Sequence, residues 1–301
     1  MKKKNLRKRF KASYLGTMIN PSRFHRSQIK FILILLPIVL VMLVPIVFII
    51  SHAFKPLDEL YAYPPKIFAS RITFDNFKNL FEAAAQTEVP FSRYLFNSIV
   101  ACILVIILSL AISSLGAYAF SFLNFKGKKL LFSATQIAIM FVPIAVAVPR
   151  YMVLTFLGIT NTFMAHIIPL LAMPVGIFLL KQFMDQIPRD LIDAASMDGA
   201  NKLQFYWYIV LPLVKPALAT VAILAFQASW NNVESSQLYL VNENLKTLPY
   251  YFGTLTMGLS SIASQGMAAA ASLIIFLPNI IVFIILQSNV MSTMAHSGLK
   301  G

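Results

Sequence analysis

Apolar residues in this chain gather in long runs separated by polar segments, with no sustained alternation. The first run, Phe31 to Ile50, holds 20 residues and no charged side chain. Because a helix rises 1.5 Å per residue, about 20 apolar residues cross the hydrocarbon core of a bilayer. Similar runs predict an all-α, polytopic membrane helix bundle with six transmembrane helices, at residues 31–50, 97–122, 130–149, 160–180, 214–230 and 266–286.

Two predicted spans are less regular than the others. The fourth lies within the charge-free stretch 151–180, and a short turn near Gly158 to Asn161 is predicted to open it. The fifth has a short apolar core from Pro216, which residues 203–214 would lengthen if they continue the helix. The polar segment 54–93 is compatible with a small helix or a cap, and the sequence leaves that choice open.

Composition agrees with a membrane protein. Hydrophobic residues make up 58% of the 301 residues and charged residues only 12%, whereas soluble domains carry about 25% charged residues. The one cysteine, Cys102, lies in an apolar run and has no partner for an internal disulfide.

The positive charge is unevenly distributed, and this predicts the orientation. Residues 1–30 form a basic tail with ten Lys and Arg and no acid, which places the N-terminus in the cytoplasm by the positive-inside rule. Six spans then give cytoplasmic segments with 18 basic and four acidic residues, and external segments with seven of each. We therefore predict a multi-pass membrane protein with both termini in the cytoplasm. The tail is expected to contact anionic membrane lipid, and no nucleic-acid partner is expected.

The loop at residues 187–213 does not fit a plain bundle. Pro188 suits a helix start, and Gly199 is placed to end that helix in a left-handed turn. Asn201 can cap a second helix, and Pro212 is predicted to stop it. The first helix would present a small, alanine-rich surface suited to close docking in another protein's groove. From spacing alone, an interfacial helix resting on lipid is equally consistent, although such helices are usually basic and this one has no Lys or Arg.

This loop resembles the EAA loop of bacterial ABC-importer permeases. The resemblance rests on Asp193-Ala194-Ala195, then Asp198-Gly199-Ala200, and Leu211-Pro212-Leu213 ten residues later. Asp193 stands where that family usually has Glu. Further stretches resemble the maltose-type (MalG-like) carbohydrate permeases, inner membrane components of binding-protein-dependent transport: Asn97-Ser98, Gly116-Ala117-Tyr118-Ala119-Phe120, Thr247-Leu248-Pro249, Met267-Ala268-Ala269-Ala270 and the tail Gly298-Leu299-Lys300-Gly301.

The resemblance implies a permease subunit of an ATP-driven importer in a bacterial cytoplasmic membrane, with residues 31–301 as its transmembrane domain. The chain lacks a Gly-x-x-x-x-Gly-Lys phosphate loop, so no cofactor is expected on it. ATP and Mg would be bound by a cytoplasmic ABC ATPase pair. A second homologous permease and an extracellular or periplasmic solute-binding protein are the other implied partners. The implied solute is a sugar or oligosaccharide, with a polyol phosphate, peptide or amino acid as the alternative.

The resemblance assigns roles to three segments. Coupling to the ATPases is implied for Leu191, Asp193, Ala194, Ala195, Asp198, Gly199, Ala200, Leu211 and Pro212. The tail Gly298, Leu299, Lys300 and Gly301 would contact the ATPases, and residues 242–250 would meet the binding protein.

Candidates for the solute path come from polar residues inside the spans, which are costly in lipid and often functional. Amides suit sugar hydroxyls and an indole suits a sugar ring, which selects Gln136, Gln227, Trp230, Asn231 and Asn279. The alternative for each is a hydrogen bond between helices. A membrane-embedded enzyme is disfavoured, because four scattered His and one Cys offer no metal site or nucleophile–base pair. No metal ligands or catalytic residues are predicted.

Overall fold

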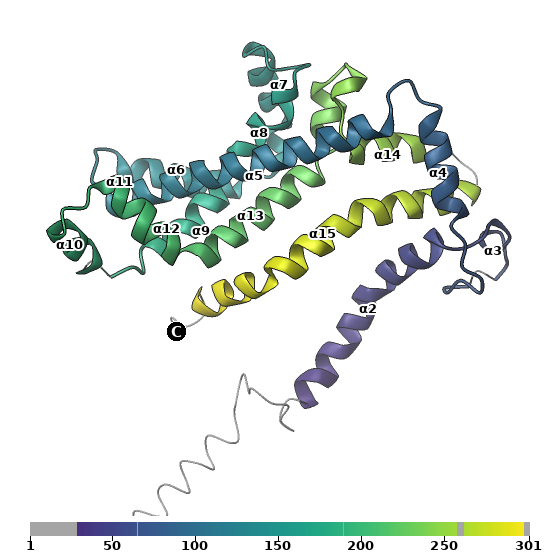
Figure 1. Cartoon of the computed structure of the whole chain (residues 1–301), viewed down its shortest axis with the longest axis horizontal. Coiled ribbons are helices and arrows are strands. Elements are labelled where there is room, and N and C mark those ends of the chain that lie inside the picture. The colour runs from purple at the N-terminus through teal and green to yellow at the C-terminus, as the bar shows by residue number, and fades with distance from the viewer. Residues whose placement is uncertain (1–28, 65, 189, 258–261, 298–301) are drawn as a thin grey trace, which may run out of the picture.

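The computed structural model describes residues 29–64, 66–188, 190–257 and 262–297. Nearly all of the predicted basic tail and the predicted ATPase-contacting residues 298–301 lie outside the described residues. Within the described part every regular element is helical, as predicted (Figure 1).

Among the described residues, three helices are long and apolar enough to cross a membrane alone. They are α2 (Ile29–Ala53), α5 (Phe91–Phe122) and α15 (Ile262–Ser297). Pro37 and Pro45 lie inside α2, and Pro278 lies inside α15. Proline is tolerated in such helices when neighbouring groups satisfy the freed carbonyls.

The third predicted span is broken, so the prediction of one continuous helix over 130–149 needs correction. Helix α6 (Lys128–Met140) meets the segment Pro143–Phe156 at 110°. That second segment consists of the 3-10 turn η2 (Pro143–Val146) and helix α7 (Ala147–Phe156). Phe141 and Val142 are extended, because proline at 143 disfavours helical geometry in the residue before it.

The fourth predicted span is also bent, by 42°. It begins after a turn in which Gly158 and Asn161 both have positive φ, at the place where the sequence predicted a turn. Its parts are η3 (Phe163–His166), α8 (Ile168–Leu171) and α9 (Pro174–Met184). Pro174 opens α9 and Met173 before it is not helical.

The fifth predicted span bends by 80° at Val214. Helix α13 (Lys215–Trp230) follows the bend, and α11 (Lys202–Phe205), the π turn η4 (Tyr206–Val210) and α12 (Leu211–Leu213) precede it. The prediction that Pro212 stops the helix is therefore wrong by two residues. Pro212 lies in the first turn of α12. Proline is tolerated in a first turn because a backbone N–H there has no carbonyl partner within the same helix.

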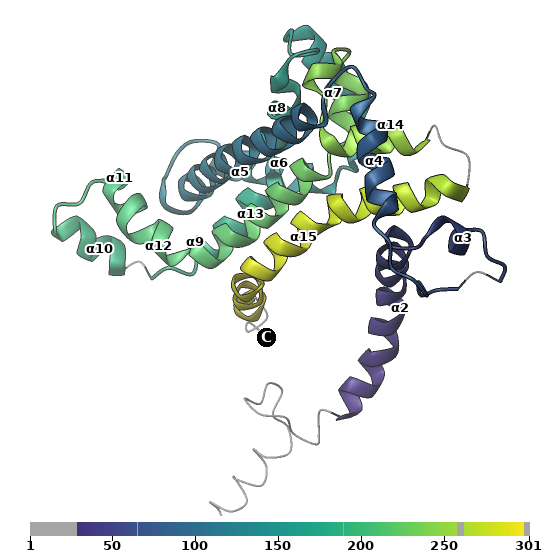
Figure 2. The same cartoon turned by 45° about the vertical axis from the view of Figure 1, so that its right-hand side comes forward.

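Helix α5 is the centre of the bundle. It packs along α9 and α13, and α13 packs in turn on α15 (Figures 1 and 2). Gly176 allows the close approach of α9 to α5, because a Cβ atom there would lie 2.9 Å from Ser113 Oγ. Helix α15 also packs against α2 and α4.

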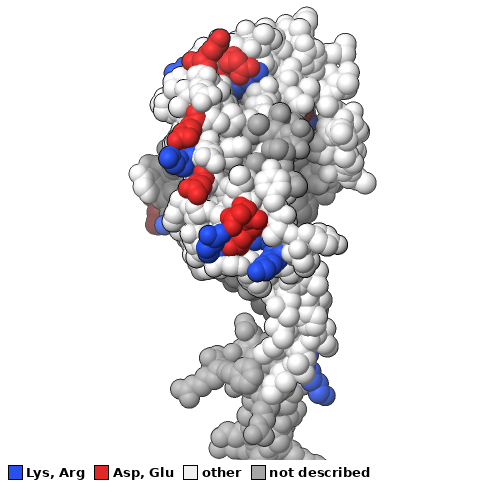
Figure 3. Space-filling view, turned by 90° about the vertical axis from the view of Figure 1, so that its right-hand side faces the viewer, with Lys and Arg blue, Asp and Glu red and all other residues white. Residues whose placement is uncertain are grey.

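Short helices cover the end of the bundle opposite α10 (Asp190–Met197) (Figure 1). The polar segment after α2 forms α3 (Leu57–Leu60) and α4 (Asp75–Ala85), and the chain between α13 and α15 forms η5 (Ser235–Tyr239), η6 (Glu243–Leu245) and α14 (Leu248–Met257). Acidic and basic side chains are interspersed on this face (Figure 3). The Asn76 amide donates to the carbonyls of His52, Ala53 and Lys55 at 2.8–3.3 Å and so ties α4 to the end of α2.

Candidate functional site

The predicted docking helix is present as α10, and its residues divide into two faces. Ala195 is buried with 6% of its surface exposed, whereas Leu191, Asp193, Ala194 and Asp198 are exposed. Asp190 and Asp193 lie in the first turn, where carboxylates oppose the positive end of the helix dipole. The outward face therefore combines acidic and small side chains with the exposed apolar side chains of Leu191 and Met197.

Gly199 ends this helix in the left-handed region, with φ +77°. Its N–H donates to the Ser196 carbonyl at 3.1 Å, and the Ala200 N–H donates to the Ala195 carbonyl at 2.9 Å. These bonds satisfy carbonyls that a helix end would otherwise leave unpaired. Residues with a side chain rarely adopt this φ, so the turn depends on glycine.

A capping box starts the second helix, as the position of Asn201 predicted. The Asn201 side chain accepts from the Gln204 N–H at 2.8 Å, and the Gln204 side chain accepts from the Asn201 N–H at 2.8 Å. Such a cap contributes about 1 kcal/mol. It fixes the direction of the chain between α10 and α11.

An apolar cluster fastens this loop to the bundle. Ala195 belongs to one buried cluster with Leu180 and Met184 of α9 and with Phe205 and Val210 from its own loop. The buried methyl of Ala195 thus connects α10 to the end of a predicted span.

Two tyrosines join the same loop to α5. The Tyr206 hydroxyl lies 2.7 Å from Ser114 Oγ, and the Tyr118 hydroxyl donates to the Lys202 carbonyl at 2.8 Å. The rings of Tyr118 and Tyr206 meet edge to face, with centroids 5.1 Å apart. Displacement of the loop therefore acts directly on the central helix.

Leu211 and Pro212, also predicted here, lie farther from α10. They belong to α12, where Leu211 is half-buried against the apolar cluster and Pro212 is exposed. Their position is next to the bend at Val214, so they connect the loop to α13.

The candidate solute-path residues separate into groups. The side-chain amides of Asn231 and Asn279 face each other, with N–O distances of 3.2 and 3.4 Å. Gln227 is exposed one helical turn before Asn231 and accepts a bond from its amide through the backbone carbonyl, at 3.1 Å. Gln136 is exposed on α6, and no contact in the described part of the chain joins it to these residues.

Trp230 is a packing residue in this structure. Only 5% of its surface is exposed, and its ring stacks on Phe226 at 5.9 Å. Its indole N–H donates to the Ile275 carbonyl at 2.9 Å. Because both the ring face and the N–H are occupied, Trp230 offers nothing to a sugar in this conformation.

A polar group that the sequence analysis missed lies near Asn231. Arg150 Nη1 is 3.2 Å from Glu234 Oε1, and the Tyr239 hydroxyl donates to the same oxygen at 2.9 Å. Burial and the bond to Glu234 together raise the pKa of Tyr239. All three line a cavity of about 510 Å³ together with Asn231 and Asn232. Arg150 and Glu234 are 84 residues apart, and nothing in the local pattern links them.

The segment 242–250 is fastened to the bundle from two sides. The Asn97 amide donates to the carbonyls of Asn244 and Lys246 at 2.8 and 2.9 Å, and His166 Nε2 lies 2.9 Å from the Leu245 carbonyl. Burial alone would lower the pKa of Lys246, but its bonds to Glu243 and Tyr250 raise it overall. This segment is therefore a preorganised surface at the end of the bundle away from α10.

Within the part of the chain that the structure describes, no three His, Cys, Asp or Glu side chains are grouped so that they could hold a metal ion. The site is thus a docked helical loop at one end of a membrane-helix bundle and polar residues at the other. This arrangement is that of a polytopic helical membrane protein in which the loop containing α10 contacts the membrane-spanning helices.

Comparison with known proteins gives the family. Residues 13–290 match the family described as "Binding-protein-dependent transport system inner membrane component". The chain belongs to this family and is a permease component, not an enzyme.

Curated relatives match nearly the whole chain. The inner membrane ABC transporter permease protein YcjP of Escherichia coli (strain K12) is 30% identical, over 91% of this chain and 97% of its own. The arabinooligosaccharides transport system permease protein AraQ of Bacillus subtilis (strain 168) is 30% identical, over 93% and 98%. The trehalose transport system permease protein SugB of Mycobacterium tuberculosis is 30% identical, over 86% and 93%.

A solved structure has the same fold. It is a chain of a bacterial ABC transporter involved in the import of the acidic polysaccharide alginate, with a TM-score of 0.73 and 22% sequence identity. The match covers 89% of this chain and 99% of that one.

Proposed function

We propose that this chain is one of two permeases in an ATP-driven importer and that α10 is its coupling helix. Each member of a cytoplasmic ATPase pair, which binds ATP and Mg, would grip the coupling helix of one permease. ATPase closure would move α10 and turn the bundle between outward- and inward-facing states. Both termini would lie in the cytoplasm, on the α10 side.

The observation that carries this proposal is the two-faced character of α10. Its outer face exposes acidic and small side chains together with Leu191 and Met197, a mixed surface that suits docking against another protein. On the other side, Ala195 is buried in a cluster with residues of α9, and the two tyrosines link the loop to α5. A helix that only rested on lipid would be expected to carry Lys or Arg and would need no such anchors.

The proposed solute is a sugar or oligosaccharide delivered by an extracellular solute-binding protein. The names of the relatives support this, since they include transport systems for trehalose and for arabinooligosaccharides. The buttressed segment 242–250 is the proposed docking surface for the binding protein. Gly298 to Gly301 are proposed to contact the ATPases.

For the solute path we propose Asn231, Asn279 and Gln227, with the neighbouring Arg150 and Glu234. The amides supply both donors and acceptors for hydroxyl groups. Gln136 would join the path only if the second permease brings it to the same channel, and Trp230 would join only if α13 separates from α15.

Gly199→Asp tests the coupling helix. A side chain at φ +77° is strained by about 1–2 kcal/mol, and the added carboxylate lies beside Asp198 at the docking surface. We expect ATP-driven solute uptake in vesicles that hold the complete importer to fall to background while the complex still assembles.

Gly158→Asp is the matched control. Gly158 also has positive φ, at +67°, and a Cβ added there would have open space around it, but it lies in the turn between α7 and η3. The Gly158→Asp substitution imposes the same kind of backbone strain away from α10 and should leave solute uptake near the wild-type level. Unchanged uptake in Gly199→Asp, or equal loss in both variants, would argue against α10 as the coupling helix.

A further inference from the structure

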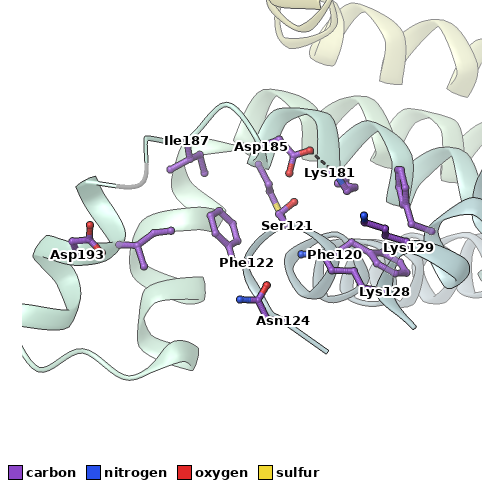
Figure 4. A pocket seen from close by; sticks show the side chains of 13 residues that line it. Phe120, Ser121, Phe122, Asn124, Lys128, Lys129, Lys181, Asp185, Ile187 and Asp193 are labelled. Carbon is purple, nitrogen blue, oxygen red and sulfur yellow. Dashed lines mark hydrogen bonds and ion pairs between the residues drawn. The ribbon is translucent and has the colours of Figure 1, made fainter. Parts of the chain in front are cut away.

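A basic cavity lies beside the coupling loop and has no role in the mechanism described above. Its volume is about 900 Å³, and it opens between the end of α5, the start of α6 and the end of α9. Lys128 and Lys129 of α6 and Lys181 of α9 line it, and Figure 4 shows these side chains gathered at one side of the space.

The charges in this cavity do not cancel locally. Lys181 Nζ forms an ion pair with Asp185 at 2.5 Å and lies 4.7 Å from the ring centroid of Phe132. Lys128 donates to the neutral carbonyl of Leu123 at 2.9 Å. Lys129 has no ion-pair partner among the residues that the structure describes. Two ammonium groups therefore face the cavity without a carboxylate.

The remaining acid among the described lining residues forms no ion pair with these lysines. Asp193 lines the cavity from α10, at the end opposite the lysines (Figure 4). A separated arrangement of this kind favours an anion between the two lysines of α6 and Lys181.

The surroundings favour an anion attached to a lipid. Phe120 and Phe132 line the cavity, and next to the lysines the side chains of Leu130 and Leu131 are 75% and 53% exposed on the surface of a predicted span. Acyl chains could lie along these residues while the headgroup reaches the lysines. Basic pockets between membrane helices on the cytoplasmic side suit phosphate headgroups.

We propose that this cavity binds the phosphate group of an anionic phospholipid from the adjacent leaflet. The proposal rests on the proposed function only in placing the α10 end at the cytoplasmic surface, where anionic lipid is concentrated. Ile187, Ile192 and Asp193 of the coupling loop line the same cavity, so the bound headgroup lies between the loop and the spans. Such a lipid links the membrane's charge to the position of α10.

The test measures lipid retention by native mass spectrometry of the complete importer, equilibrated with phosphatidylglycerol or with phosphatidylcholine. Lys128→Gln/Lys129→Gln removes two charges from the cavity. Each Lys near an anionic surface contributes about 1 kcal/mol, so the affinity of this double variant for phosphatidylglycerol should be about 30-fold lower than that of the wild type. Phosphatidylcholine, which has no net charge, should be retained poorly by every variant.

Lys126→Gln/Lys215→Gln is the matched control. It removes the same charge from the same end of the molecule, but neither residue lines the cavity. Retention should stay near wild type. Equal loss in both double variants would reduce the effect to general surface charge and overturn the site, as would no loss in either.

Two further arms separate the explanations. Lys129→Gln alone keeps the bond from Lys128 to Leu123, so it tests the site even if the double variant does not assemble; a loss of about 5-fold is expected. Stabilisation of the wild type by inorganic phosphate, with no retained phosphatidylglycerol, would overturn the lipid as the source. A transport-inactive Gly199→Asp importer should still retain the lipid, which makes failure of this proposal distinguishable from failure of the coupling proposal.

Discussion

Gly266 and Asn76 meet where α15, α4 and the end of α2 converge. A Cβ atom on residue 266 would lie 2.3 Å from Asn76 Oδ1, which is far inside van der Waals contact. The Asn76 amide cannot simply turn away, because it is buried and holds three carbonyls at the end of α2. A buried carbonyl without a donor costs about 1–3 kcal/mol.

Gly266→Ala should therefore destabilise the permease by about 2–3 kcal/mol, through overpacking and the loss of these bonds. Thermal unfolding of the purified complex would measure this. Gly253→Ala is the control, since no atom lies within 4 Å of a Cβ there, and alanine in a helix should be neutral or slightly stabilising. Equal melting temperatures for the two variants would contradict the assigned contact.

Between helices, the two tyrosine hydroxyls are the polar link from α5 to the coupling loop. Tyr118→Phe/Tyr206→Phe removes both hydroxyls and keeps the ring packing. The free energy of unfolding should fall by only about 1–2 kcal/mol, because Ser114 keeps its bond to the Ala111 carbonyl at 3.2 Å. If the loop drives α5 through these bonds, ATP hydrolysis should continue while solute transported per ATP falls several-fold.

Tyr208→Phe provides the comparison for that experiment. Tyr208 belongs to the same π turn but is 78% exposed, so loss of its hydroxyl should leave the solute-to-ATP ratio unchanged. A ratio near wild type in the double variant would mean that the apolar cluster around Ala195 suffices for coupling.

The local features of the loop could be predicted from sequence because they depend on neighbouring residues. Gly199 and Asn201 have the conformation and the cap that their types favour. The end of the second helix could not be predicted in this way. Pro212 stays helical because it falls in a first turn after a π turn, and the break occurs at Val214, just before Pro216 in the first turn of α13.

The bends in the predicted spans could also be predicted only in part from the sequence. Pro143 and Pro174 were visible in apolar runs, but the angles of 110° and 42° depend on packing against other helices. Trp230 was selected for its aromatic face, yet its partner Ile275 is 45 residues away. Arg150 and Glu234 pair across 84 residues, so contacts of this range require the folded chain.

For the whole molecule, the distribution of charge agrees with the arrangement of the helices. The α10 end collects the described lysines of the short polar segments, Lys126, Lys128, Lys129, Lys181, Lys202 and Lys215. At the other end acids and bases are mixed, with pairs such as Lys246–Glu243 and Arg71–Asp58. By the positive-inside rule, the α10 end should face the cytoplasm.

Two cysteine variants test that orientation directly. Met197 on α10 and Val241 before η6 are 83% and 84% exposed, so Met197→Cys and Val241→Cys should react equally well when the reagent reaches them. The native Cys102 is buried and gives a low background. Intact cells are treated with a membrane-impermeant thiol reagent, and the unreacted thiols are then labelled after denaturation.

Val241→Cys should be blocked from outside and take up little of the second label. Met197→Cys should escape the impermeant reagent and be labelled fully after denaturation, even if an ATPase covers it in the cell, because the second label is applied to the unfolded chain. Blocking of Met197→Cys in intact cells would place α10 outside, where no ATP-hydrolysing partner could reach it. The coupling helix and the inner-leaflet lipid site would then both be untenable, since each requires that end of the bundle to face the cytoplasm.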